Sequence, residues 1–246
     1  MVKQSRAMTI LLTRPISQSL RFAADLKPLL LDVPILISPL MVPEYLIPSI
    51  PKQDFAALIL VSPTAVEAAR RISAAGVKLP QFAYCVGDQT ATQARTAGFQ
   101  TKSASGDAMD LLALIKADSP SGALLFLRGR DSSPDLAENL KLAGLVSVSL
   151  IIYQQTAQQL TLQAEELLQG TLPVMFPVFS SRSATLLQAE LARISPKCPL
   201  WIATLSPVIA AQFDPNSVAG LRTAHHPDGA SMISAVQALH AAMGSP

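Results

Sequence analysis

Short runs of apolar residues recur along the chain, and most of them are followed by a stretch with helical spacing. The runs with the length of buried strands are 9–12, 57–61, 83–86, 124–127, 148–152, 174–179 and 200–203. Helical spacing is clearest at 64–72, 90–97 and 136–143, and a glycine stands shortly after each stretch, where helices commonly end. Strands that alternate with helices of this length predict an α/β fold, with parallel sheets covered by helices on both faces.

The apolar runs are too short or too interrupted to cross a membrane. A spanning helix needs about 20 consecutive apolar residues, whereas 29–42 contains Asp32, Pro34 and Pro39. The apolar content is instead typical of strands buried on both faces of a parallel sheet. The first eight residues are basic, but the apolar run after them is short, so we expect neither a secretory signal nor a membrane partner.

The chain carries a weak internal repeat. A shift of 119 residues places 62–66 on 181–185, 79–87 on 198–206 and 89–91 on 208–210, and a shift of 114 places 10–15 on 124–129. The order is therefore repeat A (10–40), repeat B (54–115), A again (123–153) and B again (174–240). The proline-rich stretch 38–53 and the glutamine-rich stretch 154–159 are interpreted as connectors. The pattern leaves open which A and B repeats share a domain.

Composition narrows the class of protein. Half of the 246 residues are apolar and 15% are charged, against a typical value of about 25%, which excludes a disordered chain. The net charge of +2 argues against nucleic acid as the main partner. Two cysteines form no disulfide framework, and we expect a reduced, cytoplasmic protein.

Several kinds of chemistry lack their motifs. No glycine-rich dinucleotide loop or phosphate loop follows a predicted strand, and no Gly-x-Ser-x-Gly elbow is present. Cys85 and Cys198 are isolated, and His225 and His226 are adjacent, so no spacing predicts a metal site.

Polar residues and glycines do mark the turns that follow the predicted strands. They are Thr13, Arg14, Ser62, Gly87, Thr90, Arg128, Gly129, Ser180, Ser181 and Ser206. Ligands of open α/β sheets bind beyond the carboxyl ends of the strands, where helix N-termini offer free N–H groups and a partial positive charge. This edge favours carboxylates or phosphates, although each Ser or Thr is also explained as a helix N-cap.

Two arginines and a tyrosine are the sharpest candidates. Arg14 and Arg128 each follow or end a buried strand, so their side chains emerge at the carboxyl edge. Each either faces an anionic ligand or packs on its own helix or on a nearby carboxylate. Tyr153 ends the second A repeat and is either a core aromatic with a satisfied hydroxyl or a proton donor in a cleft.

Six short segments that contain most of these residues together resemble the uroporphyrinogen-III synthase family over 9–240. The segments are 12–15, 61–66, 86–91, 127–129, 152–154 and 179–181. The resemblance implies two similar doubly wound, flavodoxin-like α/β domains with parallel sheets, joined by a two-stranded hinge. It implies a discontinuous outer domain (1–37 plus 157–246), an inserted domain (43–150) and hinge strands at 38–42 and 151–156.

The resemblance also implies a cyclising lyase of haem biosynthesis that uses no metal or organic cofactor. Its substrate is then the linear tetrapyrrole hydroxymethylbilane, whose carboxylates suit a rim of amides, hydroxyls and two arginines. Loss of the terminal hydroxyl gives an azafulvene cation, and a spiro intermediate then inverts ring D to give uroporphyrinogen III. Because the substrate can close unaided without inversion, the enzyme mainly has to hold one conformer. Tyr153 matches the family position proposed for protonating the departing hydroxyl.

One turn departs from the family pattern, and one alternative function remains. Ile209 stands where many members carry a hydroxyl, which makes Ser206 a weaker candidate.

The alternative is a non-catalytic two-domain binder or sensor of small carboxylates or phosphates; a glycosyltransferase-like enzyme lacks an evident base and nucleotide site. The expected partners are the tetrapyrrole and, transiently, the preceding enzyme of the pathway.

Overall fold

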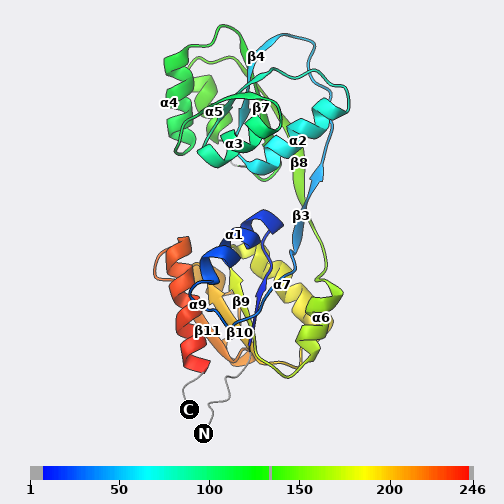
Figure 1. Ribbon diagram of the computed structural model, residues 1–246, viewed down its shortest axis with the longest axis vertical. Helices are drawn as coiled ribbons and strands as arrows, with labels where there is room; N and C mark the ends of the chain where they lie inside the picture. The colour runs from blue at the N-terminus through cyan, green and yellow to red at the C-terminus, as the bar shows by residue number, and fades with distance from the viewer. Residues whose placement is uncertain (1–7, 133–134, 244–246) are drawn as a thin grey trace. The chain divides into compact units, whose positions relative to one another are not determined.

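The computed structural model describes residues 8–132 and 135–243, which divide into two compact units (Figure 1). Unit 1 combines the two ends of the chain, Met1–Val42 and Ala157–Pro246, and unit 2 is the middle, Pro43–Thr156. Each unit has its own sheet with helices on both faces, which confirms the predicted doubly wound α/β architecture.

Unit 1 is built on a five-stranded parallel sheet in the order β11-β10-β9-β1-β2. Its strands are β1 (Thr9–Leu12), β2 (Ile35–Ile37), β9 (Val174–Val178), β10 (Leu200–Thr204) and β11 (Gly220–Thr223). Its helices are α1 (Ile16–Leu26), α6 (Leu162–Gln169), α7 (Ser181–Ile194), α8 (Pro207–Ala210), α9 (Gly229–Met243) and the 3₁₀ turn η1 (Pro215–Ser217). The cores show that α1 and α9 cover one face and α6, α7 and α8 the other (Figure 1).

Unit 2 holds the second sheet, in the order β3-β8-β7-β4-β5-β6, except for the first two residues of β3 and the last of β8, which fall in unit 1. Its strands are β3 (Met41–Tyr45), β4 (Phe55–Leu60), β5 (Phe82–Cys85), β6 (Gln100–Ser103), β7 (Ala123–Gly129) and β8 (Ser147–Ala157). Its helices are α2 (Pro63–Ala74), α3 (Asp88–Thr96), α4 (Ala108–Asp118) and α5 (Asp135–Leu142). Helices α2 and α3 share a core on one face of the sheet, and α4 and α5 share a core on the other.

The two sheets repeat one strand order, which confirms the duplication. The order β2-β1-β9-β10-β11 corresponds to β8-β7-β4-β5-β6, so β1-β2 and β7-β8 are the A repeats. One alignment needs correction: a shift of 119 paired Ser62 with Ser181, but Ser62 and Ser180 are the equivalent N-caps, 118 residues apart. The shift of 119 does hold at the next turn, where Gly87 and Ser206 are the N-caps.

The strands that the hydrophobic pattern missed are the sheet edges β2, β3, β6 and β11. Edge strands have one unpaired side and are short here, so they do not need a long apolar run. β6 (QTKS) and β11 (GLRT), for example, are largely polar. The expected connector 38–53 contains β3, and β8 continues into the expected connector 154–159.

β3 pairs with β8 in the antiparallel sense, unlike the other strand pairs described. Leu46 N–H donates to Ile152 O at 2.9 Å, and Gln158 N–H donates to Leu40 O at 3.0 Å, so residue numbers run in opposite directions. The backbone groups of even-numbered residues on β3 therefore bond to β8, and those of odd-numbered residues point away from it. Pro43 is at an odd position, so its nitrogen, which has no proton to donate, faces away from β8. This is where a proline in an edge strand is tolerated.

The helix ends follow the local sequence signals. The Ser62, Thr161 and Ser180 side chains cap their helices by accepting a backbone N–H. Gly76 and Gly98 have φ of 84° and 95°, the left-handed conformation that glycine adopts without strain after a helix.

Among the described residues, no helix combines the length and apolar character that crossing a bilayer requires.

Candidate active site

Each sheet has a point from which the chain winds outward in two directions. In unit 2 this topological switch point lies between β4 and β7, and in unit 1 between β9 and β1. Open α/β sheets bind their ligands at the carboxyl ends of the strands at such a point. The turns after these four strands therefore form the candidate site of each unit.

Tyr153 lies at the switch point of unit 2. It stands opposite Gly129 in the β7–β8 register, next to an irregularity in the pairing, and its carbonyl accepts from Arg130 N–H at 2.9 Å. Its ring lies directly over Gly129: a Cβ there would be 2.6 Å from Tyr153 Cζ and 2.8 Å from its hydroxyl oxygen. Glycine at 129 is thus the residue that lets the ring lie against the end of β7. The Tyr153 side chain is 9% exposed.

Ser62 holds the Tyr153 hydroxyl. The two oxygens are 3.1 Å apart, and Ser62 Oγ also accepts the N–H of Ala65 at 3.1 Å as the N-cap of α2. Either hydroxyl can donate to the other. When Ser62 is the donor, the phenolic proton of Tyr153 is free for another acceptor. Ser62 therefore caps α2, as expected, and the same hydroxyl contacts Tyr153.

The Arg128 side chain bonds to β8 and to the turn that follows β7. Its Nε donates to Ser149 Oγ at 2.9 Å, and Nη1 donates to the carbonyls of Gly129 at 3.2 Å and Ser132 at 3.4 Å. The side chain therefore fastens the turn after β7 to β8. The sequence left open an anionic ligand, its own helix or a carboxylate as the partner of Arg128; the partners in the structure are instead a serine hydroxyl and two backbone carbonyls.

Arg14 occupies the corresponding place in unit 1 but has different surroundings. Its guanidinium carbon lies 3.9 Å from the centroid of the Phe179 ring, and its Nε donates to Gln18 at 3.0 Å. No carboxylate pairs with it among the described residues. Burial and, second, the charge of Arg21 lower the pKa of Arg14. A half-buried cation with an aromatic ring but no counter-ion is suited to an anionic ligand.

Serine residues begin α7, directly after Phe179, the ring that Arg14 contacts. Ser180 Oγ accepts from Ser183 N–H at 3.1 Å and lies 2.9 Å from Ser183 Oγ. Ser181, the first residue of the helix, is exposed. Phe179, the ring under Arg14, belongs to the quoted family piece but was not singled out by the sequence, because only the fold brings α1 against the end of β9.

The remaining candidates differ in exposure. Gly87 is the N-cap of α3 and borders open space, whereas Thr90, one turn into that helix, is only 4% exposed. Ser206 caps α8 with its backbone, and its side chain makes no cap bond. Ile209 is 4% exposed and packs in the core, so the hydroxyl that it replaces would have been buried there.

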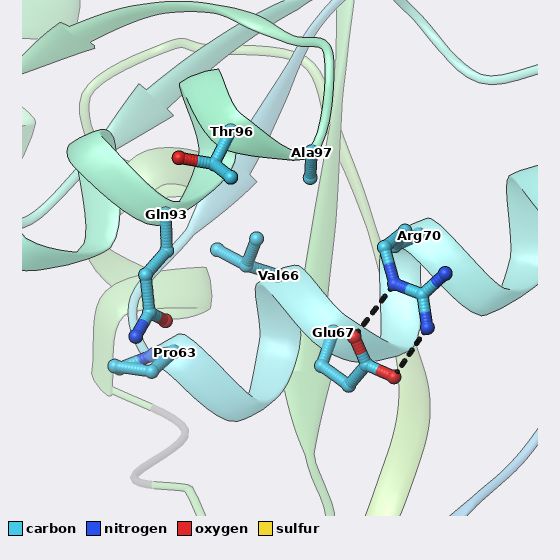
Figure 2. Close-up of a pocket in the computed structure, with 7 residues that line it drawn as sticks. All are labelled: Pro63, Val66, Glu67, Arg70, Gln93, Thr96 and Ala97. Carbon is cyan, nitrogen blue, oxygen red and sulfur yellow. Dashed lines mark hydrogen bonds and ion pairs between the residues drawn. The ribbon is translucent and has the colours of Figure 1, made fainter.

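A pocket of about 360 Å³ opens between α2 and α3 (Figure 2). Its charged lining residues are Glu67 and Arg70, which bond to each other at 2.7 and 2.8 Å. Neither Tyr153 nor Gly129 lines it. Among the described residues, no three His, Cys, Asp or Glu side chains are grouped as a metal site.

Two doubly wound sheets, with polar groups at both switch points, define a two-unit α/β protein. The particular family follows from comparison: a family model described as uroporphyrinogen-III synthase HemD matches residues 34–234, and the chain belongs to this family. The family is one of cyclising lyases in tetrapyrrole biosynthesis, and the chain is an enzyme of this kind, with a small tetrapyrrole as substrate. No curated protein sequence matches the chain.

Solved structures agree on the fold. Uroporphyrinogen-III synthetase from Helicobacter pylori 26695 aligns with a TM-score of 0.57 at 14% identity, over 94% of this chain and 99% of that one. A mutant uroporphyrinogen III synthase from the extremely thermophilic bacterium Thermus thermophilus aligns with a TM-score of 0.46 at 16% identity, over 96% of this chain and 99% of that one. At 14% identity, the likeness to the Helicobacter pylori structure shows a shared fold.

Proposed function

We propose that Tyr153 supplies the proton in the conversion of hydroxymethylbilane to uroporphyrinogen III, and that Ser62 orients it. The observation that carries this proposal is the 3.1 Å contact between the two hydroxyls at the switch point of unit 2. The ring of Tyr153 is held by its contact with Gly129, so the phenol is preorganised rather than mobile.

The proton follows a balanced path. The phenol of Tyr153 protonates the terminal hydroxyl of the substrate, the C–O bond breaks, and water departs. The substrate is then an azafulvene cation, and Tyr153 is a phenolate. Ser62 O–H then donates to the phenolate oxygen, while its own oxygen still accepts from Ala65 N–H. Ring D attacks the cation, the spiro intermediate fragments and recloses, and the ring proton lost at the end restores the phenol. General acid help of this kind contributes roughly 10²–10⁴-fold.

We further propose that Arg14 and the start of α7 bind a substrate carboxylate. Arg14 has no acidic partner among the described residues, and the ring that it contacts, Phe179, is followed directly by Ser180 and the exposed Ser181 at the start of α7. A 14-residue helix offers free N–H groups and a partial positive charge at this end. The start of α3 beyond Gly87 is less suited to an anion, because its first residue is the acidic Asp88.

The test is to assay hydroxymethylbilane conversion and to identify the product isomer. Tyr153→Phe should lose about 10²–10⁴-fold in kcat, far more than the small fall in melting temperature that loss of the hydrogen bond to Ser62 produces. Tyr84→Phe is the matched control, because Tyr84 is a buried phenol that bonds to Asp118 on the opposite face of the same sheet. A wild-type protein that yields only the uninverted type I isomer would refute the function, and full activity of Tyr153→Phe would refute the role of that residue.

The domain limits are also proposed here: an outer domain of 1–37 plus 157–246, an inserted domain of 43–150, and hinge strands at 38–42 and 151–156. They are supported by the passage of the chain between the compact units at 42–43 and 156–157. Limited proteolysis that leaves fragment 43–150 intact would support these limits, and cleavage within it would contradict them.

We propose a transient contact with the preceding pathway enzyme and a cytoplasmic location. The contact is supported by the chemistry of the substrate, which closes unaided when it is released into water. The location is supported by Cys85 and Cys198, which are both buried as free thiols. Faster conversion when the two enzymes are mixed than when the substrate is supplied free would support the contact.

A further inference from the structure

Tyr45 lies directly across the β3–β8 pair from Tyr153. The bonds Leu46 N–H to Ile152 O and Gln158 N–H to Leu40 O fix the antiparallel register, in which 45 stands opposite 153. The next pair agrees, because Gln154 Nε2 donates to Glu44 at 2.7 Å. Tyr45 and Tyr153 form a pair without backbone hydrogen bonds, the kind in which Cα atoms approach to about 4.5 Å and side chains lie closest.

Both tyrosines belong to the α2 face of the sheet. Tyr153 is part of the core under α2, and Tyr45 packs against the same core. From α2, the guanidinium of Arg71 lies 4.2 Å from the centroid of the Tyr45 ring. Glu67 accepts bonds from both Arg70 and Arg71, so this cation is held in place. The ring of Tyr45 is therefore held against α2, on the same face of the sheet as Tyr153.

The hydroxyl of Tyr45 differs from those of the other two tyrosines in the chain. Tyr153 bonds to Ser62 and Tyr84 bonds to Asp118, but the Tyr45 hydroxyl has no partner among the described residues. Burial and, second, the charge of Glu67 raise the pKa of Tyr45, so its phenol stays protonated at neutral pH. A half-buried donor without a protein partner thus stands on the strand next to the proposed proton donor, opposite it in the register.

We propose that Tyr45 is a substrate-positioning residue, whose hydroxyl donates a hydrogen bond to hydroxymethylbilane next to Tyr153. This proposal rests on the proposed function. Its effect is selective because the substrate can close by two routes, and the uninverted route needs no enzyme. A lost hydrogen bond to the substrate weakens the hold on the productive conformer, so part of the product should change from type III to type I.

The test compares three variants by kcat, KM, the ratio of product isomers and thermal melting. Tyr45→Phe removes only the hydroxyl and keeps the ring against Arg71, and Tyr45→Leu removes both. Tyr84→Phe is the matched control, because it removes a hydroxyl that bonds to the protein and has no place in the site. For Tyr45→Phe we expect kcat/KM to fall about tenfold, the share of type I product to rise, and the melting temperature to stay unchanged, because no protein group loses a partner.

The control should show the opposite pattern. Tyr84→Phe should lower the melting temperature and leave the isomer ratio unchanged. The proposal is overturned if Tyr45→Phe keeps kcat/KM within about twofold and the same isomer ratio, or if it loses stability as Tyr84→Phe does. Failure of the function is a different result, because the wild type itself would then give no type III product, and the role of Tyr45 would fail with it.

Discussion

Gly129→Ala tests whether the placement of Tyr153 depends on a missing side chain. The new Cβ would lie 2.6 Å from Tyr153 Cζ, 2.7 Å from Cε2 and 2.8 Å from the hydroxyl oxygen, all shorter than real Cβ contacts. The β7 backbone is paired with β4 as far as Leu127 and with β8 at Gly129 itself, so the ring of Tyr153 has to move instead. Moving the ring breaks its bond to Ser62 and opens packing in the core under α2.

The size of the effect follows from these contacts. Overpacking of this kind costs about 1–3 kcal/mol of unfolding free energy, which corresponds to a few degrees in the melting temperature of a domain of this size. The loss of activity should be more marked than the loss of stability, because a displacement of about 1 Å at a reacting group can lower the rate about 10²-fold. We therefore expect a folded protein that turns over hydroxymethylbilane about 100 times more slowly.

The assay combines urea unfolding with initial rates and product isomer analysis. Gly229→Ala is the matched control, since a Cβ at Gly229 would meet nothing within 4 Å and the residue lies at the start of α9, in unit 1, whereas Tyr153 belongs to unit 2. This control should keep both stability and rate. If Gly129→Ala also kept the wild-type rate and stability, the ring of Tyr153 would not need the space at 129, and the reasoning about the site would be refuted.

Three further predictions concern parts of the molecule outside the site. Gly220→Ala would place a Cβ 2.2 Å from Cε3 of Trp201, so we expect unit 1 to lose about 1–3 kcal/mol in urea unfolding, with a shifted emission from this single tryptophan. Arg70 and Arg71 lower the pKa of Glu67 from 4.5 to about 2. The contribution of Glu67 to folding stability is therefore complete above pH 4.5 and is lost as the pH falls toward 2. The stability difference between wild type and Glu67→Gln should therefore shrink between pH 6 and pH 3; a constant difference would contradict the pairing. Burial raises the pKa of Cys85 to about 11 and also raises that of Cys198, so a thiol reagent at pH 8 should label the native protein slowly and label both cysteines in denaturant.

The central strands and the repeat could be predicted because their signals are local. A strand buried on both faces must be apolar along its length, so runs such as 124–127 and 200–203 stand out without knowledge of their neighbours. The polar edge strand β6 carries no such signal, since only its pairing with β5 makes it a strand. The spacing of the strand-to-helix turns also sufficed to indicate the family.

The partners of the site residues could not be predicted in the same way. Arg14 and Arg128 look alike in sequence, as arginines close to the end of a buried strand. One lies on the ring of Phe179, whereas the other bonds to Ser149 and two carbonyls. These environments depend on which helix or strand comes next to each turn, and the neighbours are far away along the chain.

The sequence by itself determined the α/β class, the duplication, the family and the candidate phenol Tyr153, because hydrophobic runs, turn residues and their order are properties of short segments. The tertiary structure decided that Ser62 bonds to that phenol, that Gly129 makes room for its ring, and that Tyr45 stands opposite it. Ser62 and Tyr153 are 91 residues apart, and Tyr45 is more than 100 residues from Tyr153. Contacts over such separations depend on strand order and register, which side chains throughout both cores set together.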